Sequence, residues 1–241
     1  MQHDRTTAHV LRSPIALAAP ILGLVLGLVA FATVASAGCK DSPEPGVEWV
    51  NCSKERLMLG GSDLSGANIG NAMLSGTDFA GATLVGADMQ RSELVRTSFE
   101  GADLSRANME KALASRSNFG GAILRNANLT KAEFLRVDFT GADLSGADLG
   151  AGDFLRNDFT GAKLTGANLQ DAMLPRAVFA GADMTGAQMA GAFLQGSRFE
   201  GVDLSGVVGL EQAQLDLTCG DASTVLPAGL AVPAKWPCTP D

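Results

Sequence analysis

The chain has no tyrosine, and only two of its 241 residues are histidine. Both of them, His3 and His9, lie close to the N-terminus. From residue 38 onward the sequence therefore contains no imidazole. This absence excludes histidine general bases, Ser-His-Asp triads and histidine-ligated zinc from that part of the chain. A glycine-rich phosphate loop followed by Lys-Ser or Lys-Thr is also missing.

Charge is scarce between Pro14 and Ala35, a run that is almost entirely apolar. Arg5 and Arg12 precede this run, and small residues follow it at 35–37, which is the three-part pattern of a secretory signal peptide. The run also approaches the roughly 20 residues that span a bilayer, so an uncleaved membrane anchor is an alternative. A lipoprotein acylated at Cys39 is a third, weaker one. All three interpretations place the rest of the chain outside the cytoplasm.

The central part of the chain repeats every five residues, as in residues 141–145 and 146–150. Thirty positions, spaced five apart from 59 to 204, hold Leu, Ile, Met or Phe, with Ala114 as the single exception. The residue two places earlier is almost always small. A period of five fits neither a helix nor a strand. It indicates one flat side and one corner per five residues, stacked into a solenoid.

This pattern closely resembles that of the pentapeptide-repeat proteins, whose signature is approximately A-(D/N)-L-x-x, over about residues 57–208. The resemblance implies an all-β solenoid, a right-handed quadrilateral β-helix with about 20 residues per coil. It also implies that the large central residue and the small residue two before it point inward. About seven coils at ~4.8 Å each would make a rod roughly 35 Å long.

Phenylalanine supports a coil of four repeats independently. It recurs at every fourth central position in what we call the core Phe ladder, at Phe79, Phe99, Phe119, Phe139, Phe159, Phe179 and Phe199. A second column holds Phe134 and Phe154, after Ala114. Because voids in packed interiors are costly, we expect a large neighbour to fill the room that Ala114 leaves.

Each end of the predicted rod carries a cysteine pair. Four cysteines allow three pairings. Bridged Cα atoms lie within about 7 Å of each other, whereas the two ends would be roughly 35 Å apart. We therefore predict the disulfides Cys39–Cys52 and Cys219–Cys238, which are typical of an oxidising compartment.

Four segments follow from these patterns. They are a signal peptide or membrane anchor (1–37), an N-terminal disulfide cap (38–56), the β-helix (57–208), and a C-terminal helix with a disulfide-closed cap (209–241). In the last segment we expect a short capping helix over 210–217, with Leu210, Ala213 and Leu217 on one face and Gly220 as a stop signal. Helical C-terminal segments mediate dimerisation in some members of the resembled family, so both a monomer and a dimer remain open.

Arginine recurs at one corner of successive coils. The arginine stripe consists of Arg96, Arg116, Arg136, Arg156 and Arg176. It is a candidate interaction surface for an anionic partner, such as a phospholipid surface, a cell-wall polymer or an acidic protein. The alternative is a solvated corner whose charge is compensated by acids two or three residues away, namely Glu93, Glu133, Asp138, Asp153 and Asp158.

Acidic and amide residues form other columns. One contains Asn68, Asp88, Asn108, Asn128, Asp148, Asn168 and Gln188, and another contains Asp143, Asp183 and Asp203. Stacked carboxylates could bind Ca²⁺, but Asp or Asn before the central residue is the consensus of the resembled family. A catalytic carboxylate pair needs a cleft, which a smooth rod lacks. We therefore predict no metal, no cofactor and no catalytic residue.

Together these patterns predict a non-enzymatic periplasmic or secreted rod that serves a structural or protein-interaction role. Its partner would be an unidentified envelope protein or anionic polymer. We expect no nucleic-acid partner, and contact with a membrane only through an uncleaved leader, which would make the chain an inner-membrane-anchored envelope scaffold facing the periplasm.

The resemblance also implies an alternative function, because some cytoplasmic members of that family mimic duplex DNA and bind type II topoisomerases. Without residues 1–37 the formal net charge changes from −8 to −9, which agrees with such mimicry. The leader, the cysteine pairs and the arginine stripe argue against it.

Overall fold

This computed structural model describes residues 38–238. A five-residue repeat that has Asp or Asn before its central residue can satisfy all its backbone donors. In the repeat 141–145, the amides of Gly141, Asp143 and Leu144 donate to neighbouring coils over 2.7–2.9 Å. The amide of Ala142 donates to the carbonyl three residues earlier and closes a corner. The fifth donor, the amide of Ser145, bonds to Oδ1 of Asp143 at 3.1 Å. An Asp or Asn before the central residue therefore completes the repeat's hydrogen bonding.

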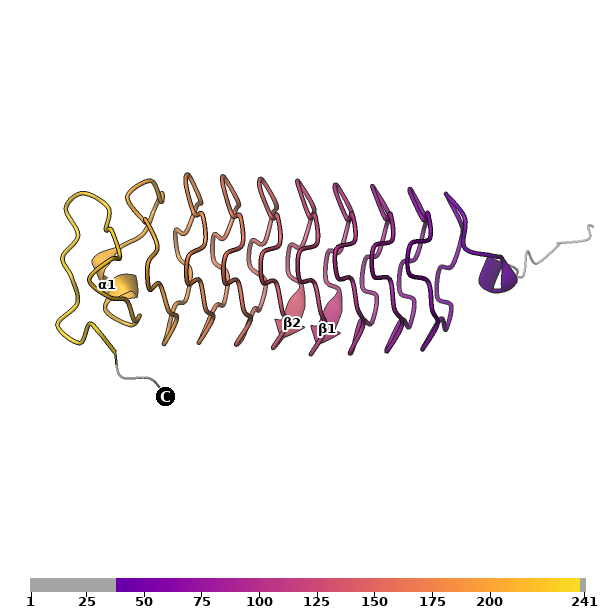
Figure 1. Cartoon of the computed structure of the whole chain (residues 1–241), viewed down its shortest axis with the longest axis horizontal. Helices are drawn as coiled ribbons and strands as arrows, with labels where there is room; N and C mark the ends of the chain where they lie inside the picture. The colour runs from indigo at the N-terminus through magenta and orange to yellow at the C-terminus, as the bar shows by residue number, and fades with distance from the viewer. Residues whose placement is uncertain (1–37, 239–241) are drawn as a thin grey trace, which may run out of the picture. The chain divides into compact units, whose positions relative to one another are not determined.

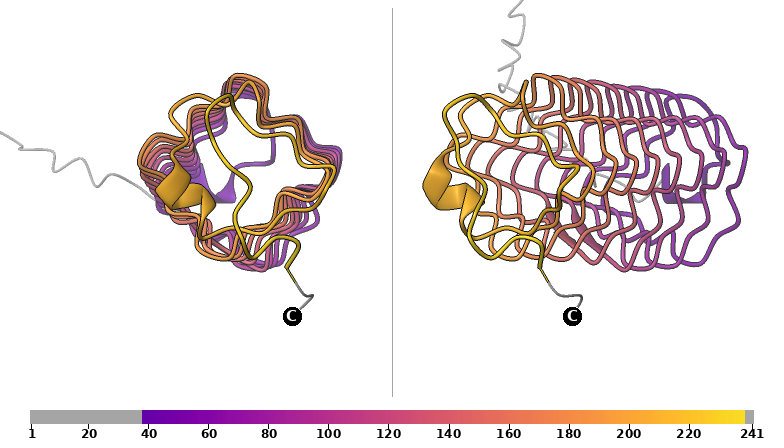
Figure 2. Two further views of the ribbon diagram at one scale, coloured as in Figure 1. Left: turned by 90° about the vertical axis from the view of Figure 1, so that its left-hand side faces the viewer. Right: turned by 60° about the vertical axis from the view of Figure 1, so that its left-hand side comes forward.

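Parallel bridges join the residue before a central position to its equivalent four repeats later, from Glu48–Asn68 through to Gln188–Val208. The bridges lengthen into two short strands at one place, where β1 (Leu113–Ser115) pairs with β2 (Glu133–Leu135). The coils stack into a rod, which is four-sided when viewed along its axis (Figures 1 and 2). The architecture is a right-handed β-helix solenoid.

The interior of the rod is filled by the central residue and the small residue of every repeat, and nearly all of these are fully buried. In the core Phe ladder, ring centroids of successive coils lie 4.7–5.1 Å apart and the rings are stacked. Stacked aromatic rings add to the stabilisation that comes from apolar burial alone. The ladder thus runs as one continuous aromatic column along the rod.

Ala114 is accommodated by its neighbour in the next coil. The ring of Phe134 lies 5.7 Å from Phe119, which belongs to the coil of Ala114, and 6.1 Å from Phe139 of its own coil. Phe134 therefore fills part of the room above the alanine, as expected. A surface hollow of about 340 Å³ remains there, lined in part by Ala114 and Leu135.

At the N-terminal end, a single turn of 3-10 helix (η1, Gly38–Lys40) precedes the first coil. Coil-to-coil bridging already begins at Glu48, before the expected start of the β-helix at residue 57. Trp49 occupies a central position, is fully buried, and has the ammonium of Lys54 4.0 Å from its ring centroid. The backbone therefore winds as a solenoid within the segment expected to be only a cap.

At the C-terminal end the regular spacing between bridged residues is lost. Arg198 pairs with Cys219, which is one position beyond the regular spacing, and Asp203 pairs with Val225, which is two positions beyond it. The first extra residue lies between Val208 and Cys219, in the segment that contains a one-turn helix, α1 (Gln212–Leu215). This helix lies at the end of the rod (Figure 2).

The apolar face expected for the C-terminal helix is wrong. Leu210 is buried, but Ala213 is exposed and Leu217 is 40% exposed. Leu215 is the buried residue of α1. Because the helix has a single turn, the helical periodicity does not extend to residue 217, which lies beyond its end.

Candidate functional site: an arginine stripe and a basic groove

Each arginine of the stripe occupies a backbone position that favours glycine. The φ angles of these five residues lie between 55° and 58°. Every fifth residue from Gly46 to Gly201 has a positive φ, and glycine is the most frequent residue at these positions. A side chain in this left-handed region costs roughly 1–2 kcal/mol, which glycine avoids. The fold alone therefore does not explain arginine on five successive coils.

The acids expected to compensate the stripe form no direct ion pair with it. Within residues 38–238 the ion pairs are Lys111–Glu110, Arg125–Asp143 and Arg198–Glu200. None involves an arginine of the stripe, and none involves the five acids expected to compensate it. The stripe's guanidinium groups also form no hydrogen bond to any residue in this range. All five arginines are exposed.

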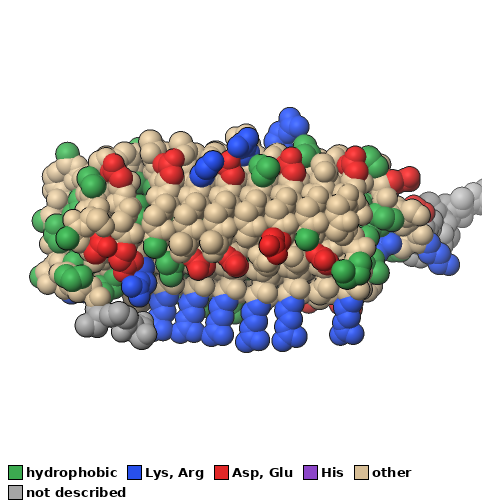
Figure 3. All heavy atoms as spheres, viewed as in Figure 1, with side chains coloured by type: hydrophobic (Ala, Val, Ile, Leu, Met, Phe, Trp, Pro, Cys, Tyr) green, Lys and Arg blue, Asp and Glu red, His purple; other side chains and the backbone are tan. Residues whose placement is uncertain are grey.

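The geometry of the corner explains why these pairs do not form. Exposed Glu93, Glu133 and Asp153 stand on the face that precedes the corner, and Asp138 and Asp158 stand on the face that follows it. The arginines project from the edge between the two faces. Figure 3 shows a row of basic side chains extending from one edge of the rod, with acidic side chains set back on the adjoining surface.

The arginine stems lean along the rod. A methyl group placed on Gly196 would lie 3.3 Å from Cγ of Arg176, and one on Gly76 would lie 3.3 Å from Cγ of Arg56. The aliphatic stem therefore covers the corner of the next coil, and the guanidinium remains in solvent. Arg56 belongs to the same column, separated from Arg96 by Gly76, and extends the stripe toward the N-terminus.

The C-terminal end of the stripe opens into a groove of about 560 Å³. Two arginines of the stripe, Arg156 and Arg176, line this groove together with Arg198 and Lys235. No Asp or Glu is among its lining residues. Leu155, Pro175 and Leu217 contribute apolar surface, and the remaining lining residues are Gln195, Gly196, Cys219 and Cys238.

The cysteines lie in the two expected pairs. Cα atoms are 5.4 Å apart in Cys39–Cys52 and 5.5 Å apart in Cys219–Cys238, and no cysteine of the described chain is free. Disulfides of this kind are typical of proteins outside the cytoplasm.

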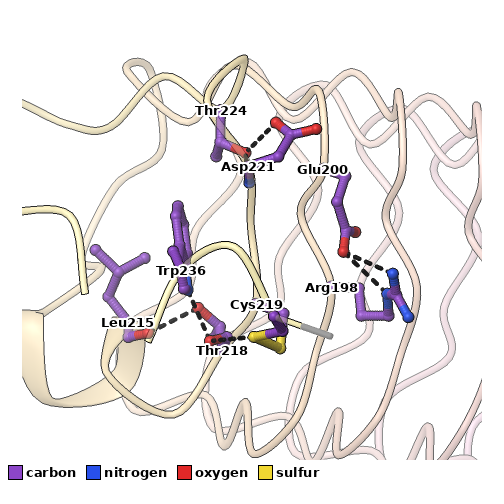
Figure 4. Close-up of a disulfide and its surroundings, with 9 residues drawn as sticks. Arg198, Glu200, Leu215, Thr218, Cys219, Asp221, Thr224 and Trp236 are labelled. Atoms are coloured by element: carbon purple, nitrogen blue, oxygen red, sulfur yellow. Dashed lines mark hydrogen bonds and ion pairs between the residues drawn. A yellow bond between two sulfur atoms is a disulfide. The ribbon is translucent and has the colours of Figure 1, made fainter. Parts of the chain in front are cut away.

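The second disulfide holds the tail against the last coil, together with Trp236 (Figure 4). The indole Nε1 of Trp236 donates to the carbonyl of Thr218 at 2.7 Å, and the Thr218 hydroxyl donates to the carbonyl of Leu215 at 2.7 Å. The Trp236 ring packs so closely on Gly220 that a Cβ there would clash with it. The glycine expected to be a helix stop is thus required by the tail's packing.

The amide-rich column forms a hydrogen-bonded ladder. The Nδ2 atoms of Asn128 and Asn168 donate to Oδ1 of Asn108 and Asp148 in the preceding coils, at 3.1 and 2.9 Å. Within the part of the chain that the structure describes, no three acidic, histidine or cysteine residues are placed to hold a metal ion together. This column therefore serves coil-to-coil contact.

Carboxylates of the other acidic column are held by their own turns. The hydroxyl and amide of Thr185 bond to Asp183 and lower its pKa, with a further contribution from Thr165. The guanidinium of Arg125 lies 2.7 Å from a carboxylate oxygen of Asp143, and this hydrogen bond raises the pKa of Arg125. The carboxylates of this column therefore stabilise their own turns and the neighbouring coil.

Two basic residues of the groove were not singled out by the sequence pattern. Arg198 stands in the column before Phe199, where four of the six other coils have Asp or Asn and none has a basic residue, and this departure was the available signal. Lys235 lies in the tail, outside any repeat, and nothing in the pattern marks it. The predicted leader and both histidines lie outside the described residues. Among residues 38–238, no helix is both long and apolar enough to cross a membrane.

Comparison with known proteins agrees with this architecture. The family description "Pentapeptide repeats" matches in eight copies, over residues 62–101, 82–121, 92–130, 115–150 and 176–206. No curated protein matches the chain. The family is generally structural or interaction-related and not enzymatic.

Several solved structures are similar. A trypsin-treated form of QnrB1, a plasmid-mediated fluoroquinolone resistance protein, is 21% identical, with 75% of this chain and 89% of that chain covered and a TM-score of 0.62. HetL, involved in heterocyst differentiation regulation in the cyanobacterium Nostoc sp. strain PCC 7120, is 23% identical, with 77% and 85% covered and a TM-score of 0.43. A pentapeptide repeat protein from the Arabidopsis thaliana thylakoid lumen is 30% identical, with 54% and 81% covered and a TM-score of 0.33.

The likeness to QnrB1 concerns the fold alone. This likeness agrees with three other observations, namely the five-residue pattern, the regularly spaced bridges between coils and the eight matched copies. The chain belongs to the family of pentapeptide repeat proteins.

Proposed function

We propose that this chain is a non-enzymatic interaction rod that works outside the cytoplasm and binds a linear anionic polymer along the arginine stripe. The observation that carries the proposal is the unpaired state of five exposed arginines on successive coils. Each stands where the backbone favours glycine. Side chains kept at a cost in stability are characteristic of functional surfaces.

The acids beside the stripe favour a linear partner over a flat one. A membrane surface pressed against the rod would meet Glu93, Glu133 and Asp153 on one face or Asp138 and Asp158 on the other. A polymer lying along the edge would contact the arginines and stay clear of these carboxylates. Arginines repeated at about 5 Å suit the closely spaced charges of a polyanion. The DNA-mimic alternative needs a continuous anionic surface, which the stripe interrupts.

The location and the absence of catalysis are supported by different observations. Two disulfides close the ends of the rod, and disulfides persist in oxidising compartments. Export would follow from the leader at residues 1–37, whose removal after Ala37 would leave Gly38 as the new N-terminus. Mass spectrometry of the purified protein tests this point, since an intact Met1 would indicate an anchor instead. Most of the stripe is an open edge, and the groove at its C-terminal end has no Asp or Glu among its lining residues, which supports a binding role over a catalytic one.

The end segments belong to the same proposal as caps of a rod of about seven coils. An open coil end exposes unpaired backbone groups that invite association. Gln214 in α1 donates from Nε2 to the carbonyls of Met189 and Ala192, at 2.9 and 2.8 Å. These are carbonyls of the last regular coil, so the contacts support a capping role for α1.

The direct test measures binding of inorganic polyphosphate, a linear phosphate polymer, to the purified rod. A variant with Arg116→Glu, Arg136→Glu and Arg156→Glu should bind at least about ten-fold more weakly, because each lost cation removes a phosphate contact. Its affinity should also depend less steeply on salt, with the slope reduced by roughly one per lost contact.

A matched control is available at another corner. Arg91, Lys111 and Lys131 share the backbone position and the positive φ of the stripe but lie on the preceding corner. Changing these three to glutamate alters the charge equally and should leave most of the binding intact. If the two triple variants lose equal polyphosphate affinity, net charge alone explains the loss, and the stripe is not the binding surface.

A further inference from the structure

The groove at the C-terminal end of the stripe differs from the rest of the stripe because it has walls. One side comes from the corners that carry Arg156 and Arg176, and the other includes Lys235 and Cys238 of the tail. Its volume of about 560 Å³ lies within the range of small-molecule sites, roughly 300–1,000 Å³. The remainder of the stripe is an open edge that could hold only an extended partner.

The electrostatics of the groove favour an anion. Four cationic side chains line it, and no carboxylate is among its lining residues. Arg198 is engaged by Glu200, at 2.9 Å from Nη2 and 3.0 Å from Nε. Arg156, Arg176 and Lys235 form no ion pair with any residue between 38 and 238. Three uncompensated cations around one groove suit a ligand with more than one negative charge.

The groove is not purely polar. Leu155, Pro175 and Leu217 line it, and Leu217 is 40% exposed although it is large and apolar. The disulfide adds two polarisable sulfur atoms to the lining. A ligand with an apolar or ring-shaped body would cover this surface while its charged group contacts the cations.

The tail wall is held by named contacts. The Cys219–Cys238 disulfide and the Trp236 hydrogen bond to Thr218 hold the tail against the last coil (Figure 4). Lys235 directly precedes Trp236 in the sequence. The position of Lys235 therefore depends on the disulfide. Reduction of the bond would release one wall of the groove together with one of its three unpaired cations.

We infer that this groove is a binding site for a phosphomonoester with an apolar or ring-shaped body, and that the Cys219–Cys238 disulfide keeps the site formed. The inference deepens the proposed function and rests on it, because the site shares Arg156 and Arg176 with the stripe and would anchor the phosphorylated end of a polymer or lipid. Phosphate carries between one and two charges near neutral pH, and arginine can bind it through two parallel hydrogen bonds.

The experiment is isothermal titration of the intact oxidised protein with phenyl phosphate and, separately, with inorganic phosphate. We expect phenyl phosphate to bind at least about five-fold more tightly, because only it covers the leucines. Lys235→Ala should weaken phenyl phosphate binding about ten-fold while leaving the disulfide in place. Lys131→Ala, on the preceding corner and outside the groove lining, is the matched control and should leave phenyl phosphate binding unchanged.

Two further arms extend the test. Cys219→Ser with Cys238→Ser should weaken phenyl phosphate binding at least as much as Lys235→Ala does. Short-chain phosphatidic acid and glucose 1-phosphate distinguish a lipid source from a sugar source, and tighter binding of either supports the site. Absence of saturable binding by phenyl phosphate, or unchanged binding in Lys235→Ala, would overturn the inference. If the groove fails this test but polyphosphate binding still depends on Arg116 and Arg136, the stripe binds the polymer independently of the groove.

Discussion

At residue 157, an asparagine stands in an interior column that otherwise favours hydroxyl groups. The hydroxyls of Thr97 and Ser197 donate to the carbonyls of central residues in the preceding coil, at 3.0 and 2.6 Å. Asn157 accepts a hydrogen bond from the amide of Val137 at 2.8 Å, but its buried Nδ2 has no partner among residues 38–238. A buried unsatisfied donor costs about 1–3 kcal/mol.

Asn157→Thr should therefore stabilise the rod. Threonine is close to asparagine in size, and its hydroxyl could donate to the carbonyl of Phe134, the equivalent central residue of the preceding coil. We expect the free energy of unfolding to rise by about 1–2 kcal/mol, measured by denaturant titration. The reverse change, Thr97→Asn, should lower it. A less stable Asn157→Thr variant would contradict this account of the column.

Asp183 makes stability depend on pH. Hydrogen bonds from Thr185, and then from Thr165, lower the pKa of this carboxyl group in the folded chain. Because the folded pKa is lowered, the ionised carboxylate stabilises the folded chain at pH values above the ordinary pKa of about 3.9. This stabilisation is lost as the pH falls through the folded pKa. The pKa values of Asp63, Asp203 and Asp221 are lowered in the same direction, by serine hydroxyls two residues later.

Melting temperatures between pH 6 and pH 3 test this contribution. They should stay level down to about pH 4 and then fall. Asp183→Asn should make the melting temperature depend less steeply on pH. The rod should stay folded, because an asparagine oxygen accepts the same turn hydrogen bond, as Asn168 does from the amide of Gln170 at 3.0 Å. An unchanged slope in Asp183→Asn would show that other groups carry the acid sensitivity.

At the scale of an element, the single-turn helix α1 depends on one side chain. Gln214 donates to two carbonyls of the last regular coil, and its Oε1 accepts the amide of Glu211 at 2.8 Å. So short a helix has little stability of its own. Its contacts with the coil, including the burial of Leu215, therefore hold it in place.

Gln214→Leu should loosen the C-terminal end. Three backbone groups would lose their partner, which costs about 1–3 kcal/mol. Hydrogen exchange should rise in residues 186–218, and the N-terminal coils should keep their protection. Gln214→Glu keeps the acceptor but loses both donors, so an intermediate effect is expected. Hydrogen-exchange rates equal to those of the wild type in both variants would show that the disulfide alone holds the C-terminal end of the rod.

At the scale of the whole molecule, the sequence allowed the coil to be predicted because its repeat is strict. The regular recurrence of phenylalanine in the core Phe ladder marks the coil length directly, and the structure has its bridges at the same spacing. The cysteine pairing was predictable because a rod keeps its two ends apart. Both predictions depend on periodicity, which a single sequence displays fully.

Direct ion pairing of the stripe could not be judged from spacing along the chain. Asp158 follows Arg156 closely in sequence, yet a corner separates their faces, and no ion pair forms between them. The groove was hidden for a different reason. Lys235 comes from a tail without any repeat, so only the three-dimensional path of that tail brings it to the groove that Arg176 lines. The irregular end segment thus carries information that the pattern lacks.

The central claim is that the arginine stripe is retained for binding and not for folding. The most direct measurement pairs the melting temperature with the polyphosphate affinity of one variant, Arg116→Gly with Arg136→Gly and Arg156→Gly. Glycine suits the positive φ of these corners and removes the repulsion between neighbouring charges. The account predicts a melting temperature equal to or above that of the wild type, with binding weakened at least about ten-fold. A lower melting temperature with unchanged binding would contradict it.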